Sequence, residues 1–255
     1  MKRAAIIALV LAFAAGAAVF ADQYQFRQAY EPDTLNGNPE YDGRLVFLRV
    51  RYNPGAPGYY RARGSNGEPP WMHDYPTSDT HLMKILKELT VAEPRTDASS
   101  VLMLDDPALM DYPIAYMSEP GYWTMSDAEA KNLRTYLLKG GLIIFDDFRE
   151  NHLYNLQEQM KRVLPDARWF VLDQNSTVFN SFFEIRNFNF GYYGKETYYG
   201  IFENNDPKGR LMAVGGYNQD LGEFWEFSDT GMMPVDLSNE AYKFGVNYFI
   251  YGLIH

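Results

Sequence analysis

Short apolar segments alternate with amphipathic segments along most of the chain, and this alternation constrains the fold more than any other feature. Continuous apolar runs occupy residues 101–104, 114–117 and 142–145, each of them short enough for a buried strand. Residues 82–89 carry leucine and isoleucine at i, i+3, i+4 and i+7, which is the stripe of a helix packed on one side. Strands that are apolar on both faces, separated by such helices, are typical of a parallel sheet covered by helices on both faces.

Local signals predict where several helices begin and end. Ser78 is expected to cap the helix that contains the 82–89 stripe. Ser126 and Glu129 form a capping-box pair before a helix that should end at the glycines of 140–141. A striped helix is expected over 153–163, followed by a closing helix over 238–253.

The remaining strands have weaker signals. Residues 45–52 alternate apolar and basic side chains, and strands are also expected at 168–172 and 178–183. Residues 184–236 are dominated by glycine, asparagine and aromatic residues, with one clear strand at 211–214. We expect this region to add loops and hairpins to a mostly parallel α/β sheet.

The first 21 residues have the three parts of a secretory signal peptide. Lys2 and Arg3 precede an uncharged apolar stretch, and residues 19–21 place small side chains at the two positions that a signal peptidase reads. We expect cleavage before Asp22 and a periplasmic or extracellular mature protein. A retained N-terminal anchor is the alternative.

Composition limits the mature chain further. Residues 22–43 are polar and predict an extended lead-in, and 44–255 show neither internal repeats nor a linker, which favours one domain. No later apolar stretch is long enough for a transmembrane segment. The chain has no cysteine, so its core must stabilise it without disulfides. A net charge of −10 argues against nucleic acid as a partner. Nothing in the sequence specifies an oligomeric state.

Acidic residues follow the predicted strands, at the sheet edge where open parallel sheets bind ligands. Glu119 follows one strand, and Asp146 and Asp147 follow another. Carboxylates that converge there could hold a divalent cation, and His152 lies close enough in sequence to join Asp146 and Asp147. The alternative is that each acid caps the next helix or loop, with at most one cap in the Asp146–Asp147 pair. We expect the pair over 105–106 to be caps.

A loop over 53–77, rich in proline and glycine, is expected to be ordered by its aromatic residues. Its Trp71, His73 and Asp74 could line a sugar or peptide site. Alternatively, Trp71 plugs the end of the core while Asp74 anchors the loop backbone. We predict that Trp71, Glu119 and Asp147 line one pocket with His152 at its rim.

Motifs for nucleophilic catalysis and for nucleotide binding are missing. The absence of cysteine excludes a cysteine–histidine triad. The Gly-x-Ser-x-Gly elbow, the Gly-x-Gly-x-x-Gly loop, the Walker phosphate loop and the His-Glu-x-x-His zinc motif do not occur either.

Several stretches of the chain resemble DUF4159, a bacterial domain family of unknown function. They lie at residues 116–121, 133–137, 140–148, 160–165, 217–220 and 245–248, with Tyr251 and His255. The resemblance implies a flavodoxin-like fold similar to class I glutamine amidotransferases and ThuA-like proteins, and it implies no activity. The amidotransferase nucleophile is a cysteine, which this chain lacks.

The resemblance has two further implications. Many relatives carry Asp-His-Pro where this chain has residues 173–175, Asp-Gln-Asn, so any role of that histidine is lost here. Family members are often encoded near AAA-type ATPases and von Willebrand A-domain membrane proteins, which implies a cell-envelope role by association.

These features favour an exported, non-catalytic binding module for a carbohydrate, a peptide or an envelope protein. The alternative is a metal-dependent hydrolase that uses Asp146, Asp147 and His152 with a divalent cation as cofactor. The sequence does not decide whether the chain is an enzyme. Carboxylates converging within about 4 Å of one point would favour the hydrolase, and an aromatic-floored groove would favour binding.

Overall fold

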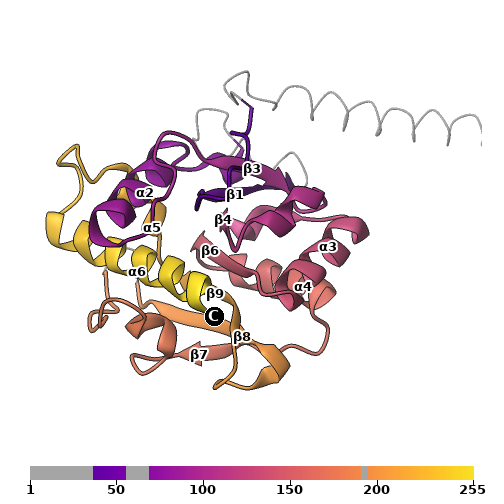
Figure 1. Ribbon diagram of the computed structural model, residues 1–255. Coiled ribbons are helices and arrows are strands. Elements are labelled where there is room, and N and C mark those ends of the chain that lie inside the picture. Colours follow the sequence, from indigo (N-terminus) through magenta and orange to yellow (C-terminus); the bar gives the residue numbers. More distant parts are fainter. Residues whose placement is uncertain (1–36, 56–68, 191–193) are drawn as a thin grey trace, which may run out of the picture. The chain divides into compact units, whose positions relative to one another are not determined.

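A seven-stranded sheet forms the centre of residues 38–255 in the computed structural model (Figure 1). The structure describes residues 37–55, 69–190 and 194–255. The predicted signal peptide, most of the lead-in and part of the aromatic loop lie outside the described residues. From one edge to the other, the strands are β3 (Ser100–Met103), β1 (Leu48–Arg51), β4 (Ile114–Ser118), β6 (Leu142–Phe148), β9 (Leu211–Tyr217), β8 (Thr197–Phe202) and β7 (Phe170–Leu172).

The strands β3, β1, β4, β6 and β9 run parallel, whereas β8 and β7 are antiparallel additions. Numbered along the chain, the parallel strands lie in the order 2-1-3-4-5, so the chain reverses its direction of travel across the sheet between β1 and β4. A separate antiparallel pair joins β2 (Asn53–Pro54) to β5 (Trp123–Thr124). The α/β class and the mostly parallel sheet are therefore confirmed.

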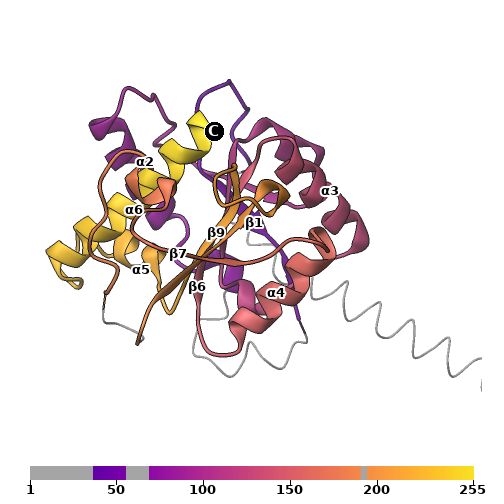
Figure 2. The same ribbon diagram turned by 90° about the horizontal axis from the view of Figure 1, so that it is seen from below.

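Helices cover both faces of the sheet, as Figures 1 and 2 show from two directions. One face carries α2 (Thr77–Leu89), α5 (Leu221–Glu226) and α6 (Val235–Ile254), and the other carries α3 (Asp127–Leu138) and α4 (His152–Val163). Among the described residues, no helix combines the length and apolar character needed to cross a bilayer.

Short 3-10 helices occupy several connections between these elements. Their bounds are Pro70–Met72, Pro107–Asp111, Pro120–Tyr122, Thr177–Asn180 and Glu203–Asn205. The helix Pro120–Tyr122 follows β4, and the helix Pro70–Met72 lies in the connection that leads to α2.

Side chains on alternate positions of the strands fill a core on each face. Toward α2 and α6, Phe47 and Ile144 are buried together with Phe249, and the rings of Phe47 and Phe249 lie 5.6 Å apart. Toward α3 and α4, Phe145 is buried with Trp123 at a ring distance of 6.0 Å. The strand β6 is thus covered on both sides, as its continuous apolar sequence predicted.

Two local predictions about helix starts have different outcomes. The Ser126 capping box is confirmed, because its hydroxyl accepts from the Glu129 N–H while the Glu129 carboxylate accepts from the Ser126 N–H. The prediction that Ser78 caps α2 is wrong. The helix already begins at Thr77, and the Ser78 hydroxyl accepts a hydrogen bond from the buried Arg49 instead.

The predicted strand at 178–183 is also wrong. This segment forms the 3-10 helix Thr177–Asn180 and irregular backbone, because Phe179 packs against Phe244 of α6 and Asn247 binds the following backbone. The region 184–236 adds the expected hairpin, formed by β8 and β9, and also the short helix α5, which was not expected.

Candidate metal centre

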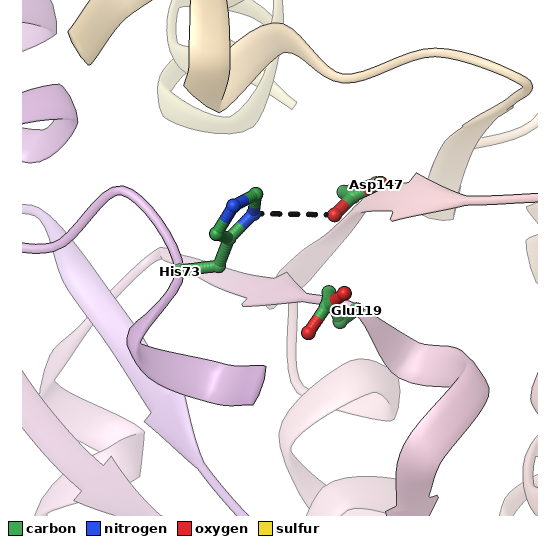
Figure 3. Close-up of side chains that lie close together, drawn as sticks. All are labelled: His73, Glu119 and Asp147. Atoms are coloured by element: carbon green, nitrogen blue, oxygen red, sulfur yellow. Dashed lines mark ion pairs between the residues drawn. The ribbon is translucent and has the colours of Figure 1, made fainter. Parts of the chain in front are cut away.

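An imidazole and two carboxylates converge at the carboxyl ends of β4 and β6 (Figure 3). Asp147 belongs to the end of β6, Glu119 follows β4, and His73 lies in the connection between β1 and α2. One ligand atom from each of these three side chains can be chosen so that all lie within 4.8 Å of one another. The group lies next to the place where the strand order reverses, which is where open α/β sheets bind ligands.

The backbone holds these side chains in unusual conformations. Asp74, Glu119 and Asp147 have positive φ angles of 64°, 47° and 49°, although none of them is glycine. Each such residue costs about 1–3 kcal/mol, and such strain gathers at functional sites. The conformation of Glu119 is held in place by its N–H, which donates to the Asp146 carbonyl of the neighbouring strand.

Asp147 is almost completely buried, yet it is surrounded by positive charge. Its Oδ2 lies 3.2 Å from Nδ1 of His73, and its Oδ1 lies 3.3 Å from a guanidinium nitrogen of Arg149. Burial acts to raise the pKa of Asp147. The close contact with His73 and the charges of Arg149, His73 and His152 outweigh this effect and lower that pKa below its ordinary value. Asp147 is therefore ionised at neutral pH, as a metal ligand must be.

His73 is partly exposed, with 39% of its side chain accessible. Burial acts to lower its pKa, but the close contact with Asp147 and the charges of Asp220, Asp147 and Glu119 raise the pKa of His73 to about 9. Without a cation, the site thus holds an imidazolium close to Asp147. A metal ion bound to the imidazole nitrogen would have to displace that proton.

Two more buried carboxylates lie beside His73. Asp74 and Asp220 form a second group with it whose ligand atoms also lie within 4.8 Å of one another. Asp220 Oδ1 accepts from the Glu223 N–H, whereas its Oδ2 accepts no hydrogen bond. Burial, reinforced by neighbouring carboxylates, raises the pKa values of Asp74 and Asp220 well above the ordinary range.

A buried arginine fixes the loop that carries His73 and Asp74. Arg49 of β1 forms an ion pair with Asp79 of α2, and neither side chain is exposed. One guanidinium nitrogen also donates to the backbone carbonyls of Trp71 (3.1 Å) and His73 (2.8 Å). Arg49 therefore ties the connection between β1 and α2 to the strand itself.

The two adjacent acids of β6 have separate environments. The carboxylate of Asp146 accepts from the Tyr116 hydroxyl and from the N–H groups of Leu221 and Gly222, at 2.7, 3.1 and 2.8 Å. Burial raises the pKa of Asp146 to about 6, against the effect of these hydrogen bonds. Asp146 thus matches the capping alternative, although the helix that it holds is α5 and not the next one along the chain.

The other predicted site residues have different positions. Trp71 is 2% exposed and plugs the core, as one of the two alternatives stated. His152 is buried at the start of α4 with its ring 4.8 Å from that of Tyr122, and it is in none of the metal-capable groups found among the described residues. Asp106 accepts from the Ala108 N–H, as expected of a cap. The shared pocket of Trp71, Glu119 and Asp147 stays a prediction.

Several residues of the site were missing from the sequence-based set, namely His73 as a ligand, Arg149 and Asp220. The Trp-Met-His-Asp run signalled His73 weakly. Asp220 with Glu223 three positions later is a helix-start signature that could have revealed α5.

Comparison with known proteins identifies the family but not an activity. A search of curated proteins finds no match. The model of the Domain of unknown function (DUF4159) matches residues 47–253, which include every residue of the site described above. The chain therefore belongs to the DUF4159 family.

Proposed function

We propose that the chain is a metal-dependent hydrolase whose divalent cation is held by His73, Glu119 and Asp147. The convergence of an imidazole and two carboxylates from three separate segments, within 4.8 Å of one another, is the observation that carries the proposal. Three protein ligands with an open position for water are typical of catalytic zinc centres. One imidazole with two carboxylates also suits Mn²⁺.

The chemistry needs a water molecule and a base. A bound divalent cation lowers the pKa of its water, so that hydroxide is available near neutral pH. Asp220 lies beside His73 with an oxygen that accepts no hydrogen bond, so its carboxylate would be placed to take up a proton from water at the centre. Burial and the neighbouring carboxylates raise the pKa of Asp220, which favours the uptake of a proton by its carboxylate. Asp220 would then hold that proton where a leaving group could take it up.

Fewer observations support the alternative of a non-catalytic binding module, whose partner would be a carbohydrate, a peptide or an envelope protein. Trp71, for which lining such a site and plugging the core were the two alternatives, is enclosed in the core. The carboxylates instead gather around one histidine.

The finer class of the fold and the location of the protein belong to the same proposal. The 2-1-3-4-5 order of the parallel strands is that of flavodoxin-like folds, which supports a class I glutamine amidotransferase-like architecture. The signal-peptide pattern of residues 1–21 supports export to the periplasm or the extracellular space.

Thermal melts with and without Ca²⁺, Mg²⁺, Mn²⁺ and Zn²⁺ test the cation, and turnover of nitrophenyl esters and phosphates tests the chemistry. A cation at a hundred times its Kd should add about 2.7 kcal/mol to the free energy of unfolding of the wild-type chain. Asp147→Asn should abolish this gain and the turnover, whereas Asp105→Asn, at an exposed position, should change neither.

If no cation raises the melting temperature, the metal centre is wrong and the binding module becomes the better hypothesis. If a cation binds without any turnover, the hydrolase chemistry is wrong and the metal has another role.

A further inference from the structure

A third group of possible ligands lies beside the proposed centre, and the mononuclear site does not use it. Glu223 and Glu226 belong to α5, and one oxygen of each lies within 4.8 Å of the other and of an Asp74 oxygen. Both glutamates are partly exposed, so solvent reaches this side of the group, while Asp74 closes its buried side.

Asp74 shows that this group lacks hydrogen-bond donors. Its side chain has no exposed surface, and neither of its carboxylate oxygens accepts a hydrogen bond. The nearest cationic atom is Nδ1 of His73, 3.6 Å from Oδ2, and that nitrogen lies nearer to Asp147. A buried carboxylate without donors is strongly unfavourable, because the water it has lost is not replaced.

Arg49 does not supply these donors. Its guanidinium donates to Asp79, to Ser78 and to two backbone carbonyls, and it affects Asp74 through charge alone. Neither Glu223 nor Glu226 forms an ion pair with a basic side chain of the described residues. Two glutamates three positions apart on a helix repel each other, and only the charges of His73 and Arg149, which form no ion pair with Glu223 among the described residues, act against this on Glu223.

The structure holds α5 firmly against Asp74. Asp146 accepts the N–H groups at the start of this helix, and Asp220 caps it. A Cβ atom at Gly222 would lie 2.3 Å from Asp74 Oδ2, so glycine is needed for the helix to approach the carboxylate this closely. Packed elements of the fold therefore hold the three carboxylates close together, and their proximity does not depend on a transient arrangement of surface side chains.

We infer that Asp74, Glu223 and Glu226 bind a second divalent cation, next to the one at His73, Glu119 and Asp147. This inference rests on the proposed function and makes the centre a two-cation site. In such sites one cation activates water while the other holds an oxygen of the substrate.

Metal stoichiometry of the full-length chain tests the inference, measured by equilibrium dialysis against Mn²⁺ followed by elemental analysis. The wild-type chain should retain two equivalents and show the electron paramagnetic resonance spectrum of a coupled pair. The double variant Glu223→Gln/Glu226→Gln should retain one equivalent and show an uncoupled six-line spectrum. The control Glu158→Gln, exposed on α4, should retain two. Circular dichroism verifies that each variant is folded.

The outcomes separate the two proposals. One equivalent in both the wild-type chain and the double variant would overturn the second cation and leave the first in place. Two equivalents in the double variant would also overturn the inference, because the second cation would then bind elsewhere. No retained Mn²⁺ in the wild-type chain, combined with no stabilisation by Zn²⁺, would overturn the proposed function itself.

Discussion

Asp146 and Asp147 are adjacent in sequence and equally buried, yet their neighbours give them opposite acidities. Asp146 faces a hydroxyl and two backbone N–H groups, and burial raises its pKa to about 6. Asp147 faces His73 and Arg149, whose charges lower its pKa despite the same burial. A residue that is ionised at every physiological pH suits a ligand, and a residue that is fully hydrogen-bonded suits an anchor.

The protonation of His73 should make metal binding depend on pH. The pKa of His73 is raised to about 9, so below that pH a cation competes with a proton for the imidazole. The affinity for Mn²⁺ should therefore rise about tenfold for each unit between pH 6 and pH 8, and isothermal titration calorimetry measures it. Calorimetry in buffers of different ionisation enthalpy should also detect a released proton.

His73→Asn provides the control for this titration, because its amide does not titrate. Its affinity should be weaker and should change less with pH. If the Mn²⁺ affinity changes equally with pH in the variant and in the wild-type chain, the proton that the cation displaces belongs to a residue other than His73.

The sequence predicted some of these residues and missed others for a physical reason. Glu119 and Asp147 directly follow apolar strands, and the geometry of a parallel sheet brings such positions together. His73 and Asp220 reach the same place through loop conformation and through the packing of α5, which depend on contacts between distant parts of the chain. No local pattern encodes such contacts.

At the scale of elements, the connection between β1 and α2 depends on one buried ion pair. Removing a single partner of a buried pair costs about 3–5 kcal/mol, whereas replacing both by apolar residues can be nearly neutral. Arg49→Met and Asp79→Leu should each destabilise the chain strongly, and the double variant should recover part of the loss. Because the double variant lacks the donors to the carbonyls of Trp71 and His73, its affinity for the cation should remain weak.

Denaturant unfolding measures the stability of these variants, and calorimetry measures the metal affinity of the folded double variant. Ser126→Ala is the matched control, since loss of the capping box should cost about 1 kcal/mol and leave the affinity unchanged. Wild-type affinity in the folded double variant would show that Arg49 does not position His73.

Element boundaries show the same contrast between local and distant causes. The capping box at Ser126 was predictable because both of its hydrogen bonds join residues three positions apart. The hydroxyl of Ser78 is directed elsewhere by Arg49, which lies 29 positions away. The strand expected at 178–183 is absent because Phe179 packs into an aromatic cluster with α6.

At the scale of the whole molecule, the buried acids should set how the stability of the metal-free protein varies with pH. The pKa of Asp146 is raised to about 6 from an unfolded value near 3.8, so the stability that this group contributes is lost as pH rises through that interval. Asp74 and Asp220 act in the same direction at higher pH. The pKa of His73 is raised too, so its contribution is lost as pH rises toward 9.

Asp147 acts in the opposite direction, because its lowered pKa gives stability that is lost only as pH falls below about 4. Between pH 5.5 and pH 8, the melting temperature of the metal-free chain should therefore fall by several degrees, at about 2–4 °C for each kcal/mol. Saturating Mn²⁺ should reduce or reverse this trend, since a cation replaces protons at the same groups.

Asp74→Asn should make the melting temperature of the metal-free chain change less with pH, and should raise the melting temperature at pH 8. The reason is that the substitution removes a buried charge that has no hydrogen-bond donor. A melting temperature that rises with pH in the metal-free chain would mean that the negative charges of these carboxylates are already balanced by groups of the protein. That result would contradict both cation sites.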